Sequence, residues 1–238
     1  MLLVTMLVGA VLLGAVLAGA AGCAQVTSRA TESGASGSGD PGASLSESCP
    51  PVPHRRFPAT TPAQATGARV VDASAGISYL SPGGPWQPWT RRASFGRVGR
   101  IVETGYYLVT QSGPPVGEYY ASVLSGRARA GVANGDPDVR CAAEHLADDL
   151  WATAGYPSPS RRLDRTGQAS TVGGRPAYLV TFRLSYDVPG YDARGEQVAV
   201  YVVDTGRSEL AVLYLSIPDT YRQYDPLVDQ VVRSVQLT

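Results

Sequence analysis

The clearest strand pattern in this chain lies at 176–186, where large apolar residues fall on one face of an extended backbone, as expected when one face is buried. They are Tyr178, Val180, Phe182, Leu184 and Tyr186. Other segments are separated by turn residues and also predict strands, and two of them, 104–111 and 117–124, are rich in tyrosine and valine. These segments are 75–80, 104–111, 117–124, 168–172, 198–204 and 209–217.

Two segments show the apolar spacing of helices instead. Between residues 139 and 151 the apolar positions follow a helical period, with Asp136 predicted as the N-cap and Pro137 at the first helical position. Gly155 is expected to end this helix. The carboxylates of Glu144, Asp148 and Asp149 are expected to face solvent.

A second helix is predicted to begin at Asp225, again with proline after the cap. Its apolar side is Leu227, Val228, Val231, Val232 and Val235. The order of elements is therefore strands, helix, strands, helix. Strands joined by turns as short as Gly173-Gly174 pair antiparallel, so the predicted fold class is α+β, an antiparallel sheet with helices packed on it.

The N-terminal segment has a different character, because residues 2–22 carry no charged side chain. Such a run fits the core of a secretory signal or a membrane helix. Ala20-Ala21-Gly22-Cys23 resembles a bacterial lipobox, which marks Cys23 as a lipidation site. Two departures weaken this interpretation, since Ala20 replaces the preferred leucine and no basic residue precedes the run. An uncleaved anchor and an ordinary cleaved signal stay open, and all three export the rest of the chain.

The chain divides into three parts on composition. Residues 1–23 are the signal or anchor, and 24–66 form a Ser-, Gly- and Pro-rich flexible linker that cannot bury enough apolar surface to fold. Residues 67–238 form the α+β domain. The expected location is extracytoplasmic, anchored to the cell membrane.

Several motifs of this domain resemble a known family. They are the Pro-Gly turn before Trp86, the Gly-Gly-Arg-Pro-Ala-Tyr entry at 173–178 and the C-terminal helix ending in Val-Arg-Ser-Val at 232–235. Together with the layout of 68–238, they resemble the PsbP-like α/β/α sandwich, as in actinobacterial lipoproteins of the LpqN and LpqT type. The resemblance implies an antiparallel sheet of about seven strands and a role in binding or assembly without catalysis, and it transfers no site residues.

Three cysteines are present. If Cys23 carries lipid, Cys49 and Cys141 are left as a pair, and an oxidising compartment favours a disulfide between them. The alternative is two separate thiols.

The sequence shows little catalytic chemistry. The formal net charge is zero, so nucleic acid is not an expected partner, and His54 and His145 do not form a metal-ligand cluster. No cofactor or metal is expected, and no nucleophile motif of the Gly-x-Ser-x-Gly kind is present. The remaining candidates for an enzyme are a Cys141–His145 pair at helical spacing and two groups of carboxylates. Those groups are Glu144, Asp148 and Asp149, and Asp187 and Asp192.

One stretch combines arginine with aromatic residues, which are enriched in binding hot spots. As a possible contact surface it comprises Trp86, Trp89, Arg91, Arg92, Phe95, Arg97 and Arg100. The alternative is that both tryptophans pack against the sheet and the arginines are only solvated.

These observations predict an exported, membrane-tethered, non-enzymatic domain that binds an envelope protein or polymer. An exported hydrolase is the alternative, and a purely structural role in the envelope is a third possibility. The sequence does not name the ligand.

Overall fold

The computed structural model of this chain describes residues 67–91, 93–94, 101–102, 104–129, 132–133, 136–153 and 155–238. The expected signal or anchor, the lipidation site Cys23, the linker and Cys49 lie outside these residues. Within the described part, no helix is both long and apolar enough to cross a bilayer.

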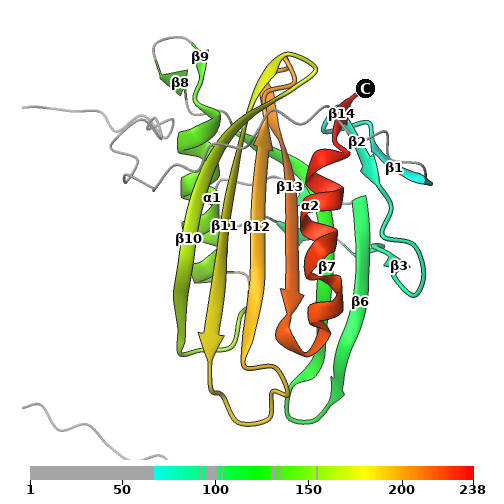
Figure 1. Cartoon of the computed structure of the whole chain (residues 1–238), viewed down its shortest axis with the longest axis vertical. Coiled ribbons are helices and arrows are strands. Elements are labelled where there is room, and N and C mark those ends of the chain that lie inside the picture. Colours follow the sequence, from blue (N-terminus) through cyan, green and yellow to red (C-terminus); the bar gives the residue numbers. More distant parts are fainter. Residues whose placement is uncertain are drawn as a thin grey trace, which may run out of the picture. The chain divides into compact units, whose positions relative to one another are not determined.

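A seven-stranded antiparallel sheet forms the centre of the domain, in the order β10-β11-β12-β13-β7-β6-β3 (Figure 1). Its strands are β3 (Gln87–Pro88), β6 (Thr104–Gly113), β7 (Gly117–Arg129), β10 (Ser160–Val172), β11 (Arg175–Tyr186), β12 (Gly195–Val203) and β13 (Glu209–Pro218). Consecutive strands pair as hairpins from β10 to β13. β6 and β7 also form a hairpin, whereas β13 pairs with β7 and β3 pairs with β6 although other elements lie between the members of each pair in the chain.

One helix covers each face of this sheet. In Figure 1, α2 (Asp225–Arg233), preceded by the 3-10 turn η1 (Asp219–Tyr224), lies in front of the sheet, and α1 (Val139–Thr153) lies behind it. The helices are buried in two separate apolar clusters, one on each side. The sheet therefore has a core on both faces, and the three layers are arranged as helix, sheet and helix (α/β/α).

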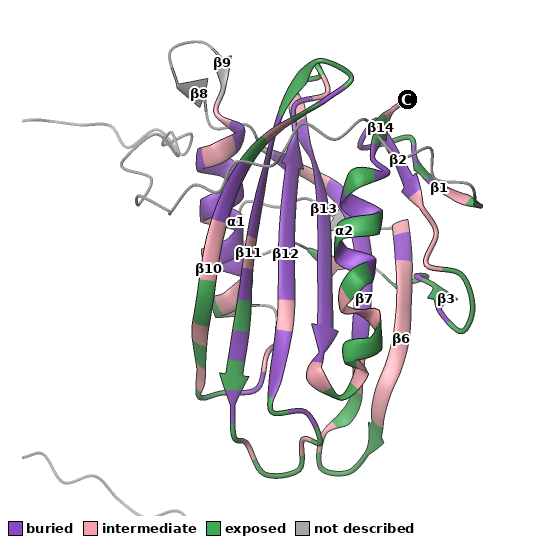
Figure 2. Ribbon diagram, in the orientation of Figure 1, coloured by how far each residue is buried: buried purple, intermediate pink, exposed green. Residues whose placement is uncertain are grey.

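The burial pattern explains why the strands differ in sequence. β12 has eight buried positions and one intermediate one, because both of its faces are covered (Figure 2). A strand buried on both faces needs apolar residues at nearly every position, which accounts for its valine-rich run. β10 at the sheet edge carries exposed residues along much of its length, among them Leu163.

Three smaller sheets complete the described part of the fold. β1 (Arg69–Asp72), β2 (Ile77–Leu80) and the C-terminal β14 (Gln236–Leu237) pair antiparallel. The other two sheets are each a pair of two-residue strands, β4 (Ala93–Ser94) with β5 (Ile101–Val102) and β8 (Val132–Ala133) with β9 (Asp136–Pro137). Asp72 joins the first small sheet to the central one, because its buried carboxylate accepts a hydrogen bond from Ser125 on β7 at 2.7 Å.

The α+β class and the antiparallel sheet predicted from the sequence are confirmed. The face predicted for 176–186 is confirmed as well, since its five large residues all lie in the cluster under α1. The prediction for 168–172 was too short, because β10 begins at Ser160, and the sequence reading did not include β1.

The predicted cap of the first helix was wrong. Asp136 and Pro137 form β9, and α1 begins at Val139. The side chain of Asp138 accepts a hydrogen bond from the backbone N–H of Cys141 at 2.9 Å, as an N-cap does.

The expectation of a solvated acidic face on α1 was also wrong for two of its three residues. Glu144 and Asp149 are buried, and Asp148 is the one that remains partly exposed. At Asp148, Arg162 and Arg165 of β10 both pair with the carboxylate. A helix surface that appears polar in sequence is therefore largely buried in the folded domain.

Candidate binding cavity on the α1 face

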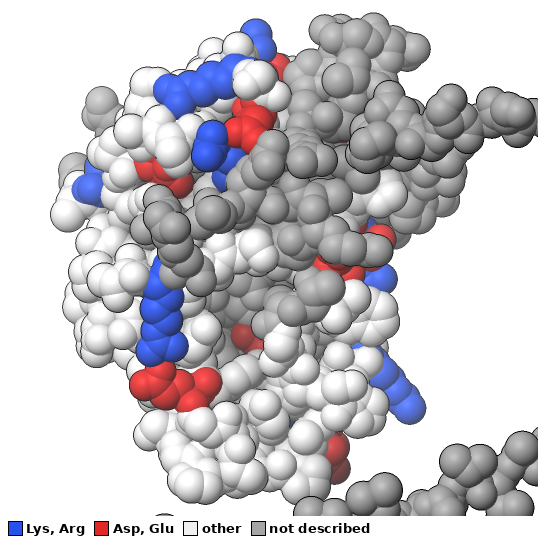
Figure 3. Space-filling view, turned by 180° about the vertical axis from the view of Figure 1, so that it is seen from behind, with Lys and Arg blue, Asp and Glu red and all other residues white. Residues whose placement is uncertain are grey.

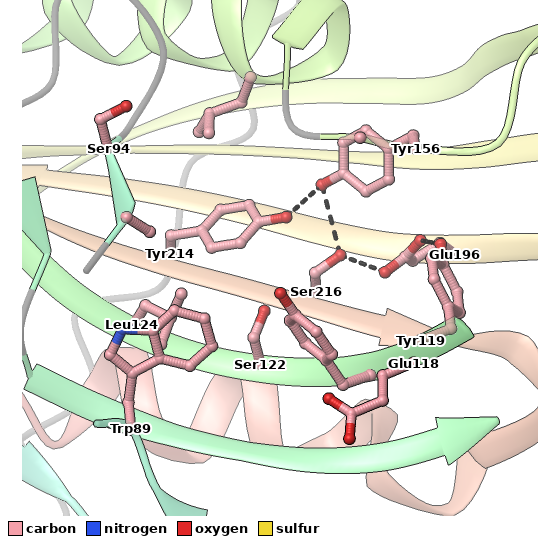
Figure 4. Close-up of a pocket in the computed structure, with 14 residues that line it drawn as sticks. Trp89, Ser94, Glu118, Tyr119, Ser122, Leu124, Tyr156, Glu196, Tyr214 and Ser216 are labelled. Atoms are coloured by element: carbon pink, nitrogen blue, oxygen red, sulfur yellow. Dashed lines mark hydrogen bonds between the residues drawn. The ribbon is translucent and has the colours of Figure 1, made fainter. Parts of the chain in front are cut away.

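A cavity of about 280 Å³ lies between the sheet and the α1 side of the domain (Figure 4). Its walls come from the segment 89–94, from β7, β12 and β13, and from the end of α1 with the residues after it. The lining residues include five aromatic side chains, namely Trp89, Tyr119, Tyr120, Tyr156 and Tyr214. Ser94, Glu118 and Gly155 at the rim are exposed, so the cavity opens to solvent.

The backbone positions two of the aromatic walls. The N–H of Trp89 donates to the carbonyl oxygen of Gly105 at 2.8 Å. Gly105 has a φ of +143°, and a Cβ there would lie 2.2 Å from the carbonyl oxygen of Val123, so only glycine fits this close approach of β6 to β7. At the other wall, Gly155 has a φ of +76°, which turns the chain after α1 so that Tyr156 reaches back to the sheet.

The buried carboxylate of Glu196 on β12 lines the inner part of the cavity. It accepts hydrogen bonds from the hydroxyl groups of Ser216 on β13 and Tyr119 on β7. Tyr119 is held in turn by the ring of Tyr191, 5.2 Å away between centroids, and by the hydroxyl of Tyr186 at 3.3 Å. Each carboxylate oxygen therefore has one neutral donor.

Further hydroxyl groups extend this arrangement, as Figure 4 shows. The hydroxyl of Tyr156 is hydrogen-bonded to that of Tyr214 and lies 3.3 Å from the oxygen of Ser216. We call Tyr119, Tyr156, Tyr214 and Ser216 the hydroxyl network around Glu196. Its members come from β7, β13 and the segment after α1, so it exists only when these parts are assembled.

Burial decides the electrostatics of the site. It raises the pKa of Glu196 from its usual 4.5 to about 7, and the nearby carboxylate of Asp219 acts in the same direction. The hydrogen bonds from Ser216 and Tyr119 lower this pKa, because they stabilise the ionised form. Burial also raises the pKa of Tyr119 and Tyr214 well above the ordinary tyrosine value, so both hydroxyls stay neutral at physiological pH.

The rim carries an exposed ion pair between Arg91 and Glu118 at 2.5 Å. The guanidinium of Arg91 also lies over the rings of Tyr107 and Tyr120, at 5.6 and 5.9 Å from their centroids. Trp89 contacts the same two rings edge-on or tilted. On the described part of the side shown in Figure 3, basic and acidic atoms lie next to each other in several places.

The structure separates the two tryptophans of the contact surface suggested by the sequence. Trp86 packs in the cluster under α2, against Tyr224, whereas Trp89 packs in the cluster under α1. Both are buried, so the two indoles do not share a face. Arg91 is exposed at the rim of the cavity. The other four residues of this stretch lie outside the described residues, namely Arg92, Phe95, Arg97 and Arg100.

None of the carboxylates or cysteines singled out in the sequence is among the described residues that line this cavity. Cys141 and His145 lie one turn apart on α1, and Asp187 is in an exposed ion pair with Arg194. Among the described residues, no group of three or more histidine, cysteine or acidic side chains is placed to hold a metal.

Sequence reasoning missed Glu196, although a signal for it was present. Glu196 falls in register with Val198, Val200 and Val202, so it extends the buried face of β12 by one more position. The predicted strand began at Val198 and did not include Glu196. A charged residue in step with a buried face is the pattern that indicates a site.

Comparisons with known proteins bear on the layout of the fold. No protein-family model matches the chain, and no curated protein matches it. Among solved structures it is similar to the cyanobacterial PsbP protein, CyanoP, from Synechocystis, with 17% identity and a TM-score of 0.46 over 72% of this chain and 92% of that one. It is also similar to LpqN, a protein involved in cell envelope biogenesis of Mycobacterium tuberculosis, with 15% identity and a TM-score of 0.37 over 72% of this chain and 85% of that one. The PsbP and LpqN types named in the resemblance are thus both among the solved structures to which the chain is similar, at low sequence identity.

Proposed function

We propose that this chain is a non-enzymatic binding domain, tethered by its N-terminal segment to the outer side of a cell membrane, and that its ligand site is the cavity on the α1 face. The observation that carries the proposal is the aromatic-walled cavity with buried Glu196. Protein interiors are close-packed, and an open, largely apolar pocket with a few convergent polar groups is the usual form of a ligand site.

The size of the cavity limits the ligand. At about 280 Å³ it lies near the lower end of the range of about 300–1,000 Å³ that small-molecule sites occupy. The ligand is therefore a small molecule or one group of a larger envelope component. A bulky protein surface would bind elsewhere.

The binding role is tested on the full chain extracted from its own membranes in a mild detergent. Native mass spectrometry is expected to show a small non-covalent adduct that is lost on denaturation. Ser122→Phe, at a buried position of the cavity wall, and Ser94→Trp, at the rim, should both lose the adduct. Ser208→Phe, in an exposed turn, is the matched control and should keep it. A wild-type protein without any adduct, or an adduct that survives in both cavity variants, contradicts the proposal.

The tether is supported by the uncharged run at 2–22, the lipobox-like residues before Cys23 and the linker at 24–66. Intact mass of the membrane-extracted protein tests it. We expect a diacylglyceryl-modified Cys23 at the N-terminus and a mass two hydrogens lower than that of the fully reduced chain, from a Cys49–Cys141 disulfide. An unmodified full-length chain would favour an uncleaved anchor, and a protein recovered from the cytosol with free thiols would overturn the tether.

A second candidate function, an exported hydrolase, is favoured by one observation. Glu196 and Glu118 both line the cavity in unlike environments, one buried with its pKa raised and one exposed in an ion pair, as general acid and base groups often are. Against it, both oxygens of Glu196 already accept hydrogen bonds. A panel of nitrophenyl esters and glycosides tests this candidate. Turnover that is lost in Glu196→Gln and kept in Ser208→Phe would replace the binding role by hydrolysis.

A further inference from the structure

Glu196 is a buried carboxylate that has no cationic partner in the part of the chain that the structure describes. None of the ion pairs among those residues includes it. A buried charge is costly unless it is paired, and Glu196 has only the neutral donors Ser216 and Tyr119. The charge neutralisation that a buried carboxylate normally requires is therefore missing at a position that lines an open cavity.

The hydroxyl network presents acceptors rather than donors to the cavity. When Glu196 is ionised, Ser216 and Tyr119 direct their protons to its oxygens. Tyr214 can donate its proton to the hydroxyl oxygen of Tyr156, and Tyr156 can donate in turn to Ser216. The protons are used within the network, whereas each hydroxyl oxygen keeps a lone pair. A ligand group made only of donors suits such a site, and an ammonium group is one.

The walls of the cavity favour the same sign of charge. Ring faces carry the negative part of the aromatic quadrupole and attract cations. Trp89, Tyr119, Tyr120, Tyr156 and Tyr214 line the cavity, and no arginine is among its described lining residues. The guanidinium of Arg91 at the rim is already paired with Glu118. Among the described lining residues, an anionic ligand would meet a buried carboxylate and aromatic side chains without a counter-charge.

From this geometry we infer that the cavity binds a small organic cation, with a protonated amine directed at the carboxylate of Glu196. This inference rests on the proposed binding function and names its ligand class. The apolar part of the ligand packs against the aromatic walls, and the ammonium group replaces the missing partner of the carboxylate. The pairing is charge-assisted and shielded from water, which makes it stronger than the same contact at the surface.

Binding should depend on pH through Glu196. The titratable groups packed around it are Tyr119 from β7, Tyr186 from β11, Tyr214 from β13, Tyr156 after α1 and Asp219 from η1. Burial raises the pKa of each of these tyrosines, so they do not ionise near neutral pH. Asp219 accepts a hydrogen bond from the backbone N–H of Arg194 and pairs with Arg222. Glu196 is therefore the group whose charge changes near pH 7.

The affinity for a cation should increase with pH. A cation binds the ionised carboxylate, so affinity should rise with pH up to about pH 8 and then level off. With a pKa of about 7, affinity at about pH 5 should be about 100-fold weaker than at about pH 8, because only about 1% of Glu196 is ionised at the lower pH. At about pH 7, binding should release about half a proton.

Three probes of one shape and different charge test the inference: cyclohexylammonium, cyclohexanol and cyclohexanecarboxylate. Their binding to the full chain is measured by calorimetry in two buffers of different ionisation enthalpy, which also counts the protons released. We expect the ammonium probe to bind at least about tenfold more tightly than the alcohol, and the carboxylate to bind most weakly. Equal binding of all three, tightest binding of the carboxylate or no binding of the ammonium probe overturns the inference.

Glu196→Gln provides the specific variant. It keeps the shape of the side chain and one acceptor oxygen but removes the charge. The variant should therefore abolish the preference for ammonium, the proton release and the pH dependence while cyclohexanol still binds. Asp229→Asn, an exposed position on α2 across the sheet, changes the net charge equally and should leave all three unchanged. If Glu196→Gln does not fold, the pH dependence of ammonium binding to the wild type tests the inference instead, and an affinity that does not rise with pH contradicts it. A missing preference for cations would contradict only this inference, because the native mass experiment tests the binding role of the cavity independently.

Discussion

Ser216 on β13 donates a hydrogen bond to the buried carboxylate of Glu196 on β12. The two side chains share a face because Ser216 pairs with Val198, two positions along from Glu196. On the rest of that face the same two strands present valine, leucine and tyrosine to α1. Buried polar groups are costly in such a core unless they are hydrogen-bonded. This polar pair at the end of an apolar sheet face therefore indicates a functional site.

The raised pKa of Glu196 predicts how stability depends on pH. The folded state holds the proton up to about pH 7, whereas the unfolded chain releases it near 4.5, so the free energy of unfolding should fall as pH rises between these values and then stay constant. The full loss is about 3 kcal/mol for a shift of this size. Urea unfolding of the wild type and Glu196→Gln across this range measures it. The variant should lack this part of the slope, and parallel profiles for the two proteins would contradict the prediction.

The hydrogen-bond donors to Glu196 should each hold its pKa down. Ser216→Ala and Tyr119→Phe remove a donor to the ionised form, so each should raise the pKa of Glu196 above its wild-type value and destabilise the protein by about 1–3 kcal/mol at alkaline pH. Carbon-13 NMR of the glutamate carboxyl groups follows the titration. Ser170→Ala is the control, because Ser170 bonds to Tyr201 instead of Glu196. A pKa that is unchanged in both variants would show that burial alone sets it.

The double-sided core predicts a large cost for truncation in a central strand. Leu213 on β13 is fully buried in the cluster under α2, so Leu213→Ala should reduce the free energy of unfolding by about 2–5 kcal/mol. Leu163 on the edge strand β10 is 48% exposed, and Leu163→Ala should cost less than about 1 kcal/mol. Chemical denaturation of both variants checks the contrast, and similar losses would mean that the cluster is not packed as described.

The cap of α1 can be tested directly. Asp138→Ala removes the acceptor for the N–H of Cys141 and should cost about 0.5–2 kcal/mol. Asp136→Ala should cost little, because Asp136 lies before the helix in β9. Thermal unfolding of the two variants distinguishes the positions, and a larger loss at Asp136 would restore the cap predicted from the sequence.

Much of the fold could be predicted from local patterns. The large residues at 178–186 identify a strand face, and the spacing of Leu227, Val228 and Val231 identifies α2, because side-chain direction repeats with the backbone geometry of each element. Edges and caps were less predictable. At 160–167 the residues of β10 are largely polar, as suits an edge strand, and they gave no apolar signal.

The candidate site was not predictable in the same way. Tyr119, Tyr156, Glu196 and Ser216 belong to separate elements, and they meet because β13 pairs with β7 and because the chain turns at Gly155. Neither the strand pairing nor the packing of the turn against the sheet can be predicted from a short segment of sequence. Glu144 and Asp149 illustrate the same limit. Helical spacing predicts that both face solvent, whereas both are buried in the folded domain, where an arginine of β10 contacts α1.

The sequence by itself therefore determined the types of element, their order and most of their buried faces, since these depend on periodicities of a few residues. Only the tertiary structure decided which elements are neighbours, and with that the location of the cavity and the raised pKa of Glu196. The physical reason is that desolvation and hydrogen bonding act on a side chain through whatever surrounds it in space, and those surroundings come from residues far apart along the chain.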